Sequence, residues 1–445
     1  MKKVNIAWFR RDLRLDDNAA LYHALKSPHP VIPVFIFDRN ILDDLEEKKD
    51  RRVEFIREAL LEMQEELKKY DSSLEVYYGK PVNVYEELLD TYEIETVFAN
   101  EDYEQYALDR DAAVQKLLHK KGASLQLYKD HVIFNGAEVL KDDGQPYTVF
   151  TPYSKKWKAV LNDFYLKSYP LKKYAGNFYR QPPHRIPSLE SMGFEKTGES
   201  FPSKTVRADL LKDYKERRDF PGEPGTSRIG VHLRFGTVSI RRLAAKAKDI
   251  SDTYLNELIW RDFYQMILWH FPHVRQYQSF RPEFDHLKWR NNTAEFEKWC
   301  KGQTGYPLVD AGMRELNATG FMHNRVRMVV ASFLSKHLLI DWRWGEAYFA
   351  KKLLDYDYAA NNGGWQWSAG TGCDAMPYFR IFSPEAQLKK FDKELKYVRK
   401  WVPEFEGFEY AKPVVEHEFA RKRALDVYSK AAKEKDKNRS AGNYA

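Results

Sequence analysis

The chain has 445 residues, more than one hydrophobic core usually supports, so we expect two domains. Lysine and arginine total 72 against 65 acidic residues, and a net charge of +7 is compatible with a polyanionic partner without requiring one. Two cysteines exclude a disulfide framework, and the lack of a long apolar run excludes a secretory signal or membrane span, which indicates a cytoplasmic protein, nucleoid-associated in a prokaryote.

Short apolar runs alternate with helical patterns over residues 1–134. Apolar residues at helical spacing predict helices over 51–70 and before Gly122. Strands alternating with helices predict a parallel, five-stranded Rossmann-like sheet that is covered on both faces. The five predicted strands are VNIAWF (4–9), VIPVFIFD (31–38), LEVYYG (74–79), ETVFAN (95–100) and LQLYKDHVIF (125–134).

The first predicted strand is not followed by G-x-G-x-x-G, which disfavours a simple NAD enzyme. A charged loop, Trp8–Asn18, follows it instead, and we interpret this loop as a solvated turn rich in ion pairs. Residues 135–204 show weak periodicity and frequent proline, which predicts a connector along the surface. The patterns over 205–445 are helical and predict an all-α second domain, with the charged segment 430–445 extending into solvent.

The stretch NNGGWQWSAGTG, residues 361–372, sets two tryptophans beside paired asparagines and glycines. Asn and Gly are poor helix formers, so we expect a turn that presents Trp365 and Trp367 from irregular backbone. Aromatic residues make up 15% of the chain, and such side chains both fill cores and stack on nucleobases or heterocycles. For Trp289 and Trp342, as for Trp365, core packing is the default interpretation.

Two polar patterns admit a structural or a binding interpretation. The loop GTSRIG, residues 225–230, could surround a phosphate with hydroxyls and backbone N–H groups, or could simply cap a helix. On a helix through LNELIWRDF, Glu257, Trp260 and Arg261 share one face, either as an intrahelical ion pair beside a core indole or as a binding surface.

A third pattern, MHNRVRM, places Asn324, Arg325 and Arg327 beside Met328 on an otherwise apolar helix. Such polar groups are costly there unless they meet ligands, phosphates or acidic partners such as Asp355 and Asp357.

Other catalytic signatures are missing from the sequence. The histidines form no HExxH motif, and proline separates the two that are three residues apart, so we expect no metal site. Neither a G-x-S-x-G elbow nor a P-loop occurs, which argues against hydrolase and phosphotransferase chemistry.

Seven segments, taken in order, resemble the DNA photolyase and cryptochrome family, most closely its class I cyclobutane pyrimidine dimer photolyases. They are WFRRDLRLDDN, GTSRIG, LNELIWRDF, TGYPLVDAGMREL, MHNRVRM, DWRWGE and DYDYAANNGGWQW. They are spread along the chain, and the resemblance covers nearly all of it. The resemblance implies an amino-terminal α/β domain and a helical domain that holds a U-shaped FAD. It implies that Arg327 pairs with Asp355 and that Asn361 faces flavin N5 with an amide able to reorient. The FAD-binding residues implied are Tyr214, Thr226, Ser227, Arg228, Ile229, Gly230, Arg261, Asp355, Tyr356, Asp357 and Asn361.

The same resemblance implies a substrate, DNA that contains pyrimidine dimers, and a light-driven mechanism. Excited reduced FAD would give an electron to a flipped dimer, the cyclobutane ring would split, and the electron would return. The catalytic residues implied are Glu257, which would hydrogen-bond the dimer, Asn361, and a photoreduction relay of Trp365, Trp342 and Trp289. The DNA-binding residues implied are Arg218, Glu257, Trp260, Asn324, Arg325, Met328 and Trp367.

Some alternatives stay open at this point. Tyr106 and Ala107 replace the Asn-Glu pair that folate-binding relatives use, so the second chromophore could be a folate, a deazaflavin, a flavin or none. The chain could also be a cryptochrome-like photoreceptor without repair activity, or a light-independent flavoprotein or nucleic-acid-binding protein. We expect a monomer.

Overall fold

The computed structural model describes residues 3–442, which form two compact units. Each unit is assembled from three separate segments of the chain. The first unit comprises Met1–Glu138, Lys158–Val206 and Arg228–Leu258, and the second comprises Val139–Trp157, Arg207–Ser227 and Ile259–Ala445. The predicted division of the chain into 1–134, a connector over 135–204, and 205–445 stays a prediction.

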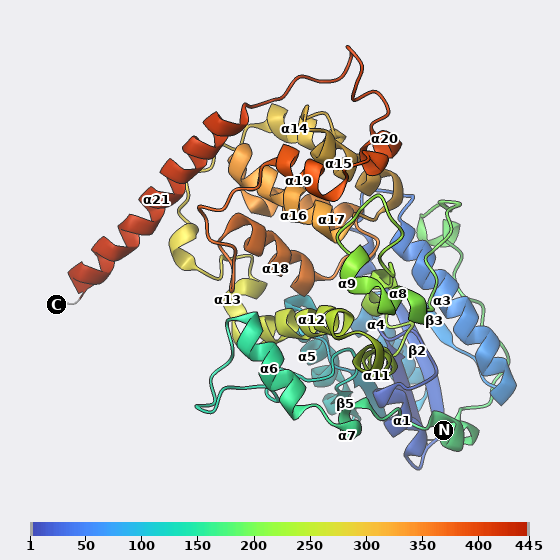
Figure 1. The fold of residues 1–445 in the computed structure, drawn as a ribbon. Coiled ribbons are helices and arrows are strands. Elements are labelled where there is room, and N and C mark those ends of the chain that lie inside the picture. The colour runs from blue at the N-terminus through green and yellow to red at the C-terminus, as the bar shows by residue number, and fades with distance from the viewer. Residues whose placement is uncertain (1–2, 443–445) are drawn as a thin grey trace. The chain divides into compact units, whose positions relative to one another are not determined.

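The first unit contains the parallel five-stranded sheet that the sequence predicts (Figure 1). Its strand order is β3-β2-β1-β4-β5. The central strand β1 and its neighbour β2 are almost wholly buried, as expected for a sheet covered on both faces. The fifth strand is shorter than predicted. It ends at Tyr128 because its one neighbour, β4, ends opposite that residue at Asn100. The strands are β1 (Lys3–Phe9), β2 (Val31–Asp38), β3 (Glu75–Gly79), β4 (Glu93–Asn100) and β5 (Ser124–Tyr128).

Helices connect these strands and complete the first unit. The predicted helix over 51–70 is α3 followed by a 3₁₀ turn, and Gly122, with a φ of 80°, follows the end of α5. The helices are α1 (Ala19–Lys26), α2 (Arg39–Leu42), α3 (Arg51–Leu67), α4 (Pro81–Thr91), α5 (Gln105–Lys120), α7 (Asp163–Leu166), α10 (Gly230–Arg234) and α11 (Ile240–Ile250), with 3₁₀ turns at Lys68–Tyr70, Leu171–Asn177 and Glu190–Met192.

The charged loop Trp8–Asn18 is largely buried, with only Asp16 exposed, so its interpretation as a solvated turn is wrong. Its expected ion pairs are nevertheless present. Arg14 pairs with Asp130 at 2.7 Å, and Arg241 reaches both Asp130 at 2.7 Å and Asp17 at 2.9 Å. Two guanidiniums against two carboxylates leave no uncompensated charge, which is the condition under which such groups tolerate burial.

The second unit is helical, and no strand occurs among its described residues, which confirms the predicted all-α class. Its core is rich in aromatic side chains, including Trp299, Phe333, Trp342 and Trp365. The helices are α8 (Ala208–Lys212), α9 (Tyr214–Arg217), α13 (Pro272–Arg275), α14 (Thr293–Lys301), α15 (Pro307–Thr319), α16 (Asn324–Ser332), α17 (Trp342–Lys352), α18 (Tyr358–Ala369), α19 (Pro384–Phe391), α20 (Lys396–Trp401) and α21 (His417–Gly442), with a 3₁₀ turn at Pro282–Phe284 and a π-helical turn at Phe333–His337.

Two segments are more ordered than the sequence suggested. The connector contains helix α6 (Phe150–Val160), whose Trp157 is fully buried and donates from its indole nitrogen to Asp262 at 3.0 Å. At the carboxyl end, α21 continues through the segment that we expected in solvent, because alanine, lysine and glutamate are strong helix formers. Residues 443–445 of that segment lie outside the described part of the chain.

The stretch that begins with Asn361 is helical, so the turn predicted there is wrong. It lies within α18, whose first turn is capped by the Asp357 side chain accepting from the backbone N–H of Ala360 at 3.2 Å. Gly363 serves close packing. A β-carbon there would lie 2.2 Å from the ring of Tyr264 on helix α12 (Asp252–His270), whereas one on Gly364 would have no neighbour within 4 Å.

These two glycines give a matched test of the packing. Gly363→Ala should destabilise the ligand-free chain by about 1–3 kcal/mol because the ring of Tyr264 must move. Gly364→Ala, one residue away, should stabilise α18 by about 0.5–1 kcal/mol through helix propensity. Denaturant unfolding of both variants measures the difference, and equal losses would show that the close contact with Tyr264 does not matter.

Candidate active site

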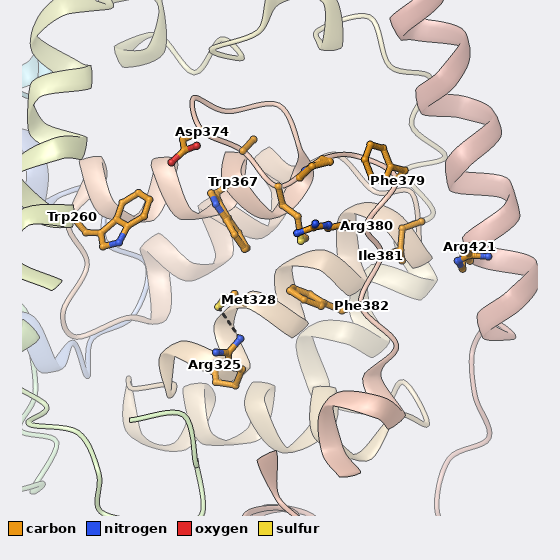
Figure 2. A pocket seen from close by; sticks show the side chains of 13 residues that line it. Trp260, Arg325, Met328, Trp367, Asp374, Phe379, Arg380, Ile381, Phe382 and Arg421 are labelled. Carbon is orange, nitrogen blue, oxygen red and sulfur yellow. Dashed lines mark hydrogen bonds between the residues drawn. The ribbon is translucent and has the colours of Figure 1, made fainter. Parts of the chain in front are cut away.

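The second unit contains an open cavity of about 710 Å³. Four of the predicted substrate-binding residues line it, and they come from three helices that are distant in sequence: Trp260 from α12, Arg325 and Met328 from α16, and Trp367 from α18 (Figure 2). Asn324, also predicted, is exposed and is not among the lining residues. The fold therefore brings most of the predicted set to one place.

Trp260 is held by aromatic packing. Its indole stacks on Phe150 of α6 with ring centroids 3.7 Å apart and planes 2° from parallel, and it also contacts Tyr264 at 5.5 Å. Both Trp260 and Trp367 are half-buried, so each exposes part of its ring to the cavity. Indole faces of this kind stack on flat heterocycles or bases. Phe150 carried no signal in the sequence analysis because it lies in the connector.

The two arginines of α16 each have an acidic partner, which explains how an otherwise apolar helix carries them. Arg325 pairs with Asp219 at 2.8 Å, lies 4.3 Å from the ring of Phe391, and contacts the sulfur of Met328. Arg325 therefore presents a partly neutralised guanidinium beside the cavity.

Arg327 lies two residues further along α16 and therefore points in another direction. One of its nitrogens donates to both carboxylate oxygens of Asp355 at 3.0 Å, so the predicted pairing is present. Asp357 caps α18 and accepts from Gln265 of α12 at 3.2 Å.

Among the predicted substrate residues, Arg218 lies over the ring of Tyr214 at 5.6 Å.

The predicted FAD-binding residues belong to both units. Within the loop Gly225–Gly230, a β-carbon on Gly225 would lie 2.4 Å from the carbonyl of Arg217, and Arg228 adopts a left-handed φ of 52°, so the backbone turns tightly there. The first unit holds Arg228, Ile229 and Gly230, with Glu257, and the second holds Tyr214, Thr226, Ser227, Arg261, Asp355, Tyr356, Asp357 and Asn361.

The amide of Asn361 is oriented by a residue that the sequence analysis did not single out. Its nitrogen donates to the Oε1 of Glu346 at 2.9 Å and to the backbone carbonyl of the same residue at 3.2 Å. Tyr356 donates to the same carboxylate oxygen at 3.3 Å. Glu346 is only 1% exposed and fixes which end of the amide turns away. The Oδ1 of Asn361 is therefore presented as an acceptor, with no partner among the residues described.

Several groups around Asn361 fit a large polar heterocycle. Gln265 Oε1 and Trp365 Nε1 are buried and have no hydrogen-bond partner among the described residues. Gly364, on the same helix as Asn361, leaves open space where a side chain would otherwise stand. Unused buried donors and acceptors are rare in folded proteins and indicate a ligand or ordered water. This chemistry suits a flavin.

The three predicted relay tryptophans share one aromatic region. Trp365 and Trp342 are buried in the core cluster, and Trp289 is half-buried and packs against the same cluster. A fourth tryptophan, Trp299, was not predicted to have a role. Its ring centroid lies 6.1 Å from that of Trp365.

Comparison with known proteins matches both halves of the chain. A family model described as "DNA photolyase" matches residues 5–172, and one described as "FAD binding domain of DNA photolyase" matches residues 254–410. A deoxyribodipyrimidine photo-lyase of Vibrio cholerae is 37% identical over 431 residues, which cover 90% of this chain and 90% of the relative. The chain belongs to the DNA photolyase family.

Solved structures of this family have the same fold. A class III photolyase from Agrobacterium tumefaciens has a TM-score of 0.84 at 31% identity, covering 97% of this chain and 98% of that one. A photolyase from Sulfolobus tokodaii with two FAD molecules has a TM-score of 0.77 at 33% identity, covering 97% and 100%. A cryptochrome from Synechocystis has a TM-score of 0.84 at 26% identity, covering 96% and 99%.

The described part of this photolyase-family chain offers neither a metal-binding cluster nor a membrane-spanning helix. No cluster of three or more His, Cys, Asp or Glu side chains among the described residues could hold a metal ion. No described helix combines the length and apolar character needed to cross a bilayer.

His323 makes the stability of α16 dependent on pH. It caps this helix by accepting from the backbone N–H of Arg325 at 3.1 Å, and burial lowers its pKa to about 4. The unfolded chain binds a proton at the ordinary histidine pKa, so the stabilisation is complete above about pH 6.5 and is lost as the pH falls toward 4, at up to about 1.4 kcal/mol per unit.

His323→Asn tests this dependence, since asparagine caps a helix without titrating. The free energy of unfolding of this variant, measured in urea at several pH values, should fall less steeply between pH 6 and 4.5 than that of the native chain. Parallel curves would show that His323 does not contribute.

Proposed function

We propose that this protein repairs cyclobutane pyrimidine dimers in DNA by a light-dependent reaction, as a deoxyribodipyrimidine photo-lyase. The observation that carries the proposal is the cavity in which Trp260, Trp367, Met328 and Arg325 meet. Two indoles offer stacking surfaces, a thioether offers a soft apolar contact, and a guanidinium offers a charge for a phosphate or a base edge.

The substrate would enter this cavity by flipping out of the duplex. A dimer already weakens stacking and pairing, so extruding it costs less than extruding intact bases. Trp260 and Trp367 would then replace the lost stacking. Arg218 and Arg325 would contact backbone phosphates, which makes binding sensitive to salt. Exposed Asn324 would lie outside the cavity, toward the duplex.

Reduced FAD, when bound, would supply the photochemistry of the reaction, a reversible one-electron transfer to the dimer. The chain's own residues would bind and shield it. Arg327 would hold Asp355 in place by the ion pair described above, and Asp355 and Asp357 would offer carboxylates to its polar groups. Trp365, Trp342 and Trp289 would form the photoreduction relay.

Asn361 would face flavin N5, and its anchoring by Glu346 restricts what it does there. With the amide nitrogen engaged by Glu346, the oxygen is the end left to accept a hydrogen bond. An acceptor favours a protonated N5 over an unprotonated one. The amide would therefore favour the reduced cofactor without having to reorient.

Glu257 distinguishes the repair enzyme from the alternative. Its carboxyl would hydrogen-bond the base edge of the dimer and stabilise the extra electron there. A cryptochrome-like photoreceptor is the second candidate, favoured by the TM-score of 0.84 to a cryptochrome. That photoreceptor would bind FAD and respond to light but would not repair DNA.

The proposal also covers the oligomeric state, the location and the second chromophore. The protein would act as a monomer in the cytoplasm, on chromosomal DNA. A second chromophore is part of the proposal without a fixed identity, since folate, deazaflavin and flavin all remain candidates. The related photolyase with two FAD molecules favours a flavin among them.

Repair is tested directly with the FAD-loaded, reduced protein. Under blue light it should restore dimer-containing DNA, and in the dark it should not. Glu257→Ala should retain FAD but repair about tenfold less per absorbed photon, the loss expected for one hydrogen bond to a charged group. Asn256→Ala, the preceding residue of α12, is the control. A native chain that binds FAD but never repairs dimers would contradict the proposal and favour the photoreceptor.

The anchoring of Asn361 has its own test. Glu346→Leu removes the acceptor, so the amide should rotate and the midpoint potential of bound FAD should shift by a few tens of millivolts, equivalent to about 1 kcal/mol for one hydrogen bond. Glu346→Gln retains an oxygen acceptor and should shift it less. Spectroelectrochemistry measures both, and equal potentials in the two variants would contradict the anchoring role.

A further inference from the structure

One wall of the cavity lies outside the motifs that identify the family. It consists of the segment Asp374–Phe382 and of Arg421 on helix α21 (Figure 2). Arg421 is 47% exposed at its side chain, and its ion pair is with Glu418 at 3.8 Å, a carboxylate that is itself 72% exposed. A long pair in solvent contributes little, so the guanidinium can change partners at small cost.

The position of Arg421 is fixed by contacts on both sides of it along α21. Before it, His417 shares a hydrogen bond of 2.8 Å with buried His337. After it, Arg423 donates to the backbone carbonyl of His337, and fully buried Tyr428 packs against Trp289 at 6.2 Å. The first half of α21 is therefore part of the body of the second unit.

The neighbouring segment is fixed as well. Buried Lys336 donates to the backbone carbonyl of Arg380 at 2.9 Å, and the ring of Tyr378 stacks on Tyr428 of α21 at 6.0 Å, 11° from parallel. The segment and the helix therefore hold one another. They present Arg380 and Arg421 along the same wall of the cavity.

The charge of this wall is positive. The cavity is lined by three arginines and one aspartate, and the aspartate, Asp374, accepts from the backbone N–H of Phe150. Arg325 is already paired with Asp219. Arg380 has no ion pair among the described residues. Because the Arg421–Glu418 pair is long and exposed, the least compensated positive charge lies on the side of Arg380 and Arg421, away from Trp260 (Figure 2).

We propose that Arg421 binds a phosphate of the damaged strand, so that α21 forms a phosphate-binding rim of the lesion cavity. The inference rests on the proposed function. A flipped dinucleotide stays joined to its strand, so the phosphates on either side of it must remain at the mouth of the cavity. A guanidinium held at that mouth meets a phosphate with two parallel hydrogen bonds.

Lys422 supplies a matched control. It is the next residue of α21, carries the same charge, is exposed, and is not among the residues that line the cavity. The experiment measures, in the dark, the binding of the full FAD-loaded chain to a duplex with one thymine dimer and to the same duplex undamaged, over a range of salt concentrations.

Arg421→Ala should bind the dimer duplex about tenfold more weakly, as expected for a hydrogen bond to a charged group. The slope of log affinity against log salt should fall by about one, the effect of one lost phosphate contact. Arg421→Lys should recover the salt slope, since it keeps the charge, but only part of the affinity, because an ammonium group cannot make two parallel hydrogen bonds to a phosphate. Lys422→Ala should match the native chain. FAD content and the thermal unfolding midpoint show whether Arg421→Ala is folded, and Arg421→Gln replaces it in the same comparison if it is not.

Equal affinities and salt slopes for Arg421→Ala and Lys422→Ala would overturn the assignment of Arg421. The proposed function would fail by a different result, a native chain that binds damaged and undamaged duplexes equally and does not repair under light. In that case the salt slopes on the undamaged duplex still decide whether Arg421 contacts a phosphate.

Discussion

The site depends on the packing of a side chain of α12 against the backbone of α18, at a point where no β-carbon fits. Gly363 lies against the ring of Tyr264, and this contact fixes the distance between the helix that carries Trp260 and the helix that carries Trp367. Side chains at cavity walls must hold their positions to within a fraction of an ångström for stacking to be effective. Because packed interiors deform little, a ring packed directly against a helix backbone leaves little freedom in that position.

Around this contact, two polar side chains of the site are held by a specific partner that leaves part of the side chain available. Glu346 engages the amide nitrogen of Asn361 and leaves its oxygen, and Asp219 engages Arg325 beside the cavity. This arrangement avoids the cost of burying unpaired groups while still offering donors and acceptors to a ligand. It also gives direction to groups that would otherwise rotate. A preorganised site of this kind loses little free energy when its ligand binds.

Fold class could be predicted well from the sequence, because alternating apolar runs and helical periodicity report directly on which faces are buried. Predictions failed where tertiary contacts outweigh local preference. The Asn-Asn-Gly-Gly stretch reads as a turn by propensity, yet it is helical because Asp357 caps it and Gly363 is needed for packing. The charged loop Trp8–Asn18 reads as solvated, yet partners more than a hundred residues away neutralise it.

The same limit applies to the site residues: those positioned by tertiary contacts could not be predicted from the sequence. Those in long motifs, such as Trp260 and Trp367, could be found because the resemblance marks them. Glu346, Phe150 and Arg421 could not, since their partners are distant in sequence and each is unremarkable among its neighbours. The role of a charged or aromatic residue depends on its neighbours in space, and these are set only when the chain folds.

Helix α21 begins after residue 410, where the match to the family's flavin-binding module ends. Arg421 thus lies beyond that match, whereas the segment Asp374–Phe382 of the same wall lies within it. The charge on this side of the cavity can therefore change by substitution in α21 without any change in the residues of α12, α16 and α18 that line the rest of it.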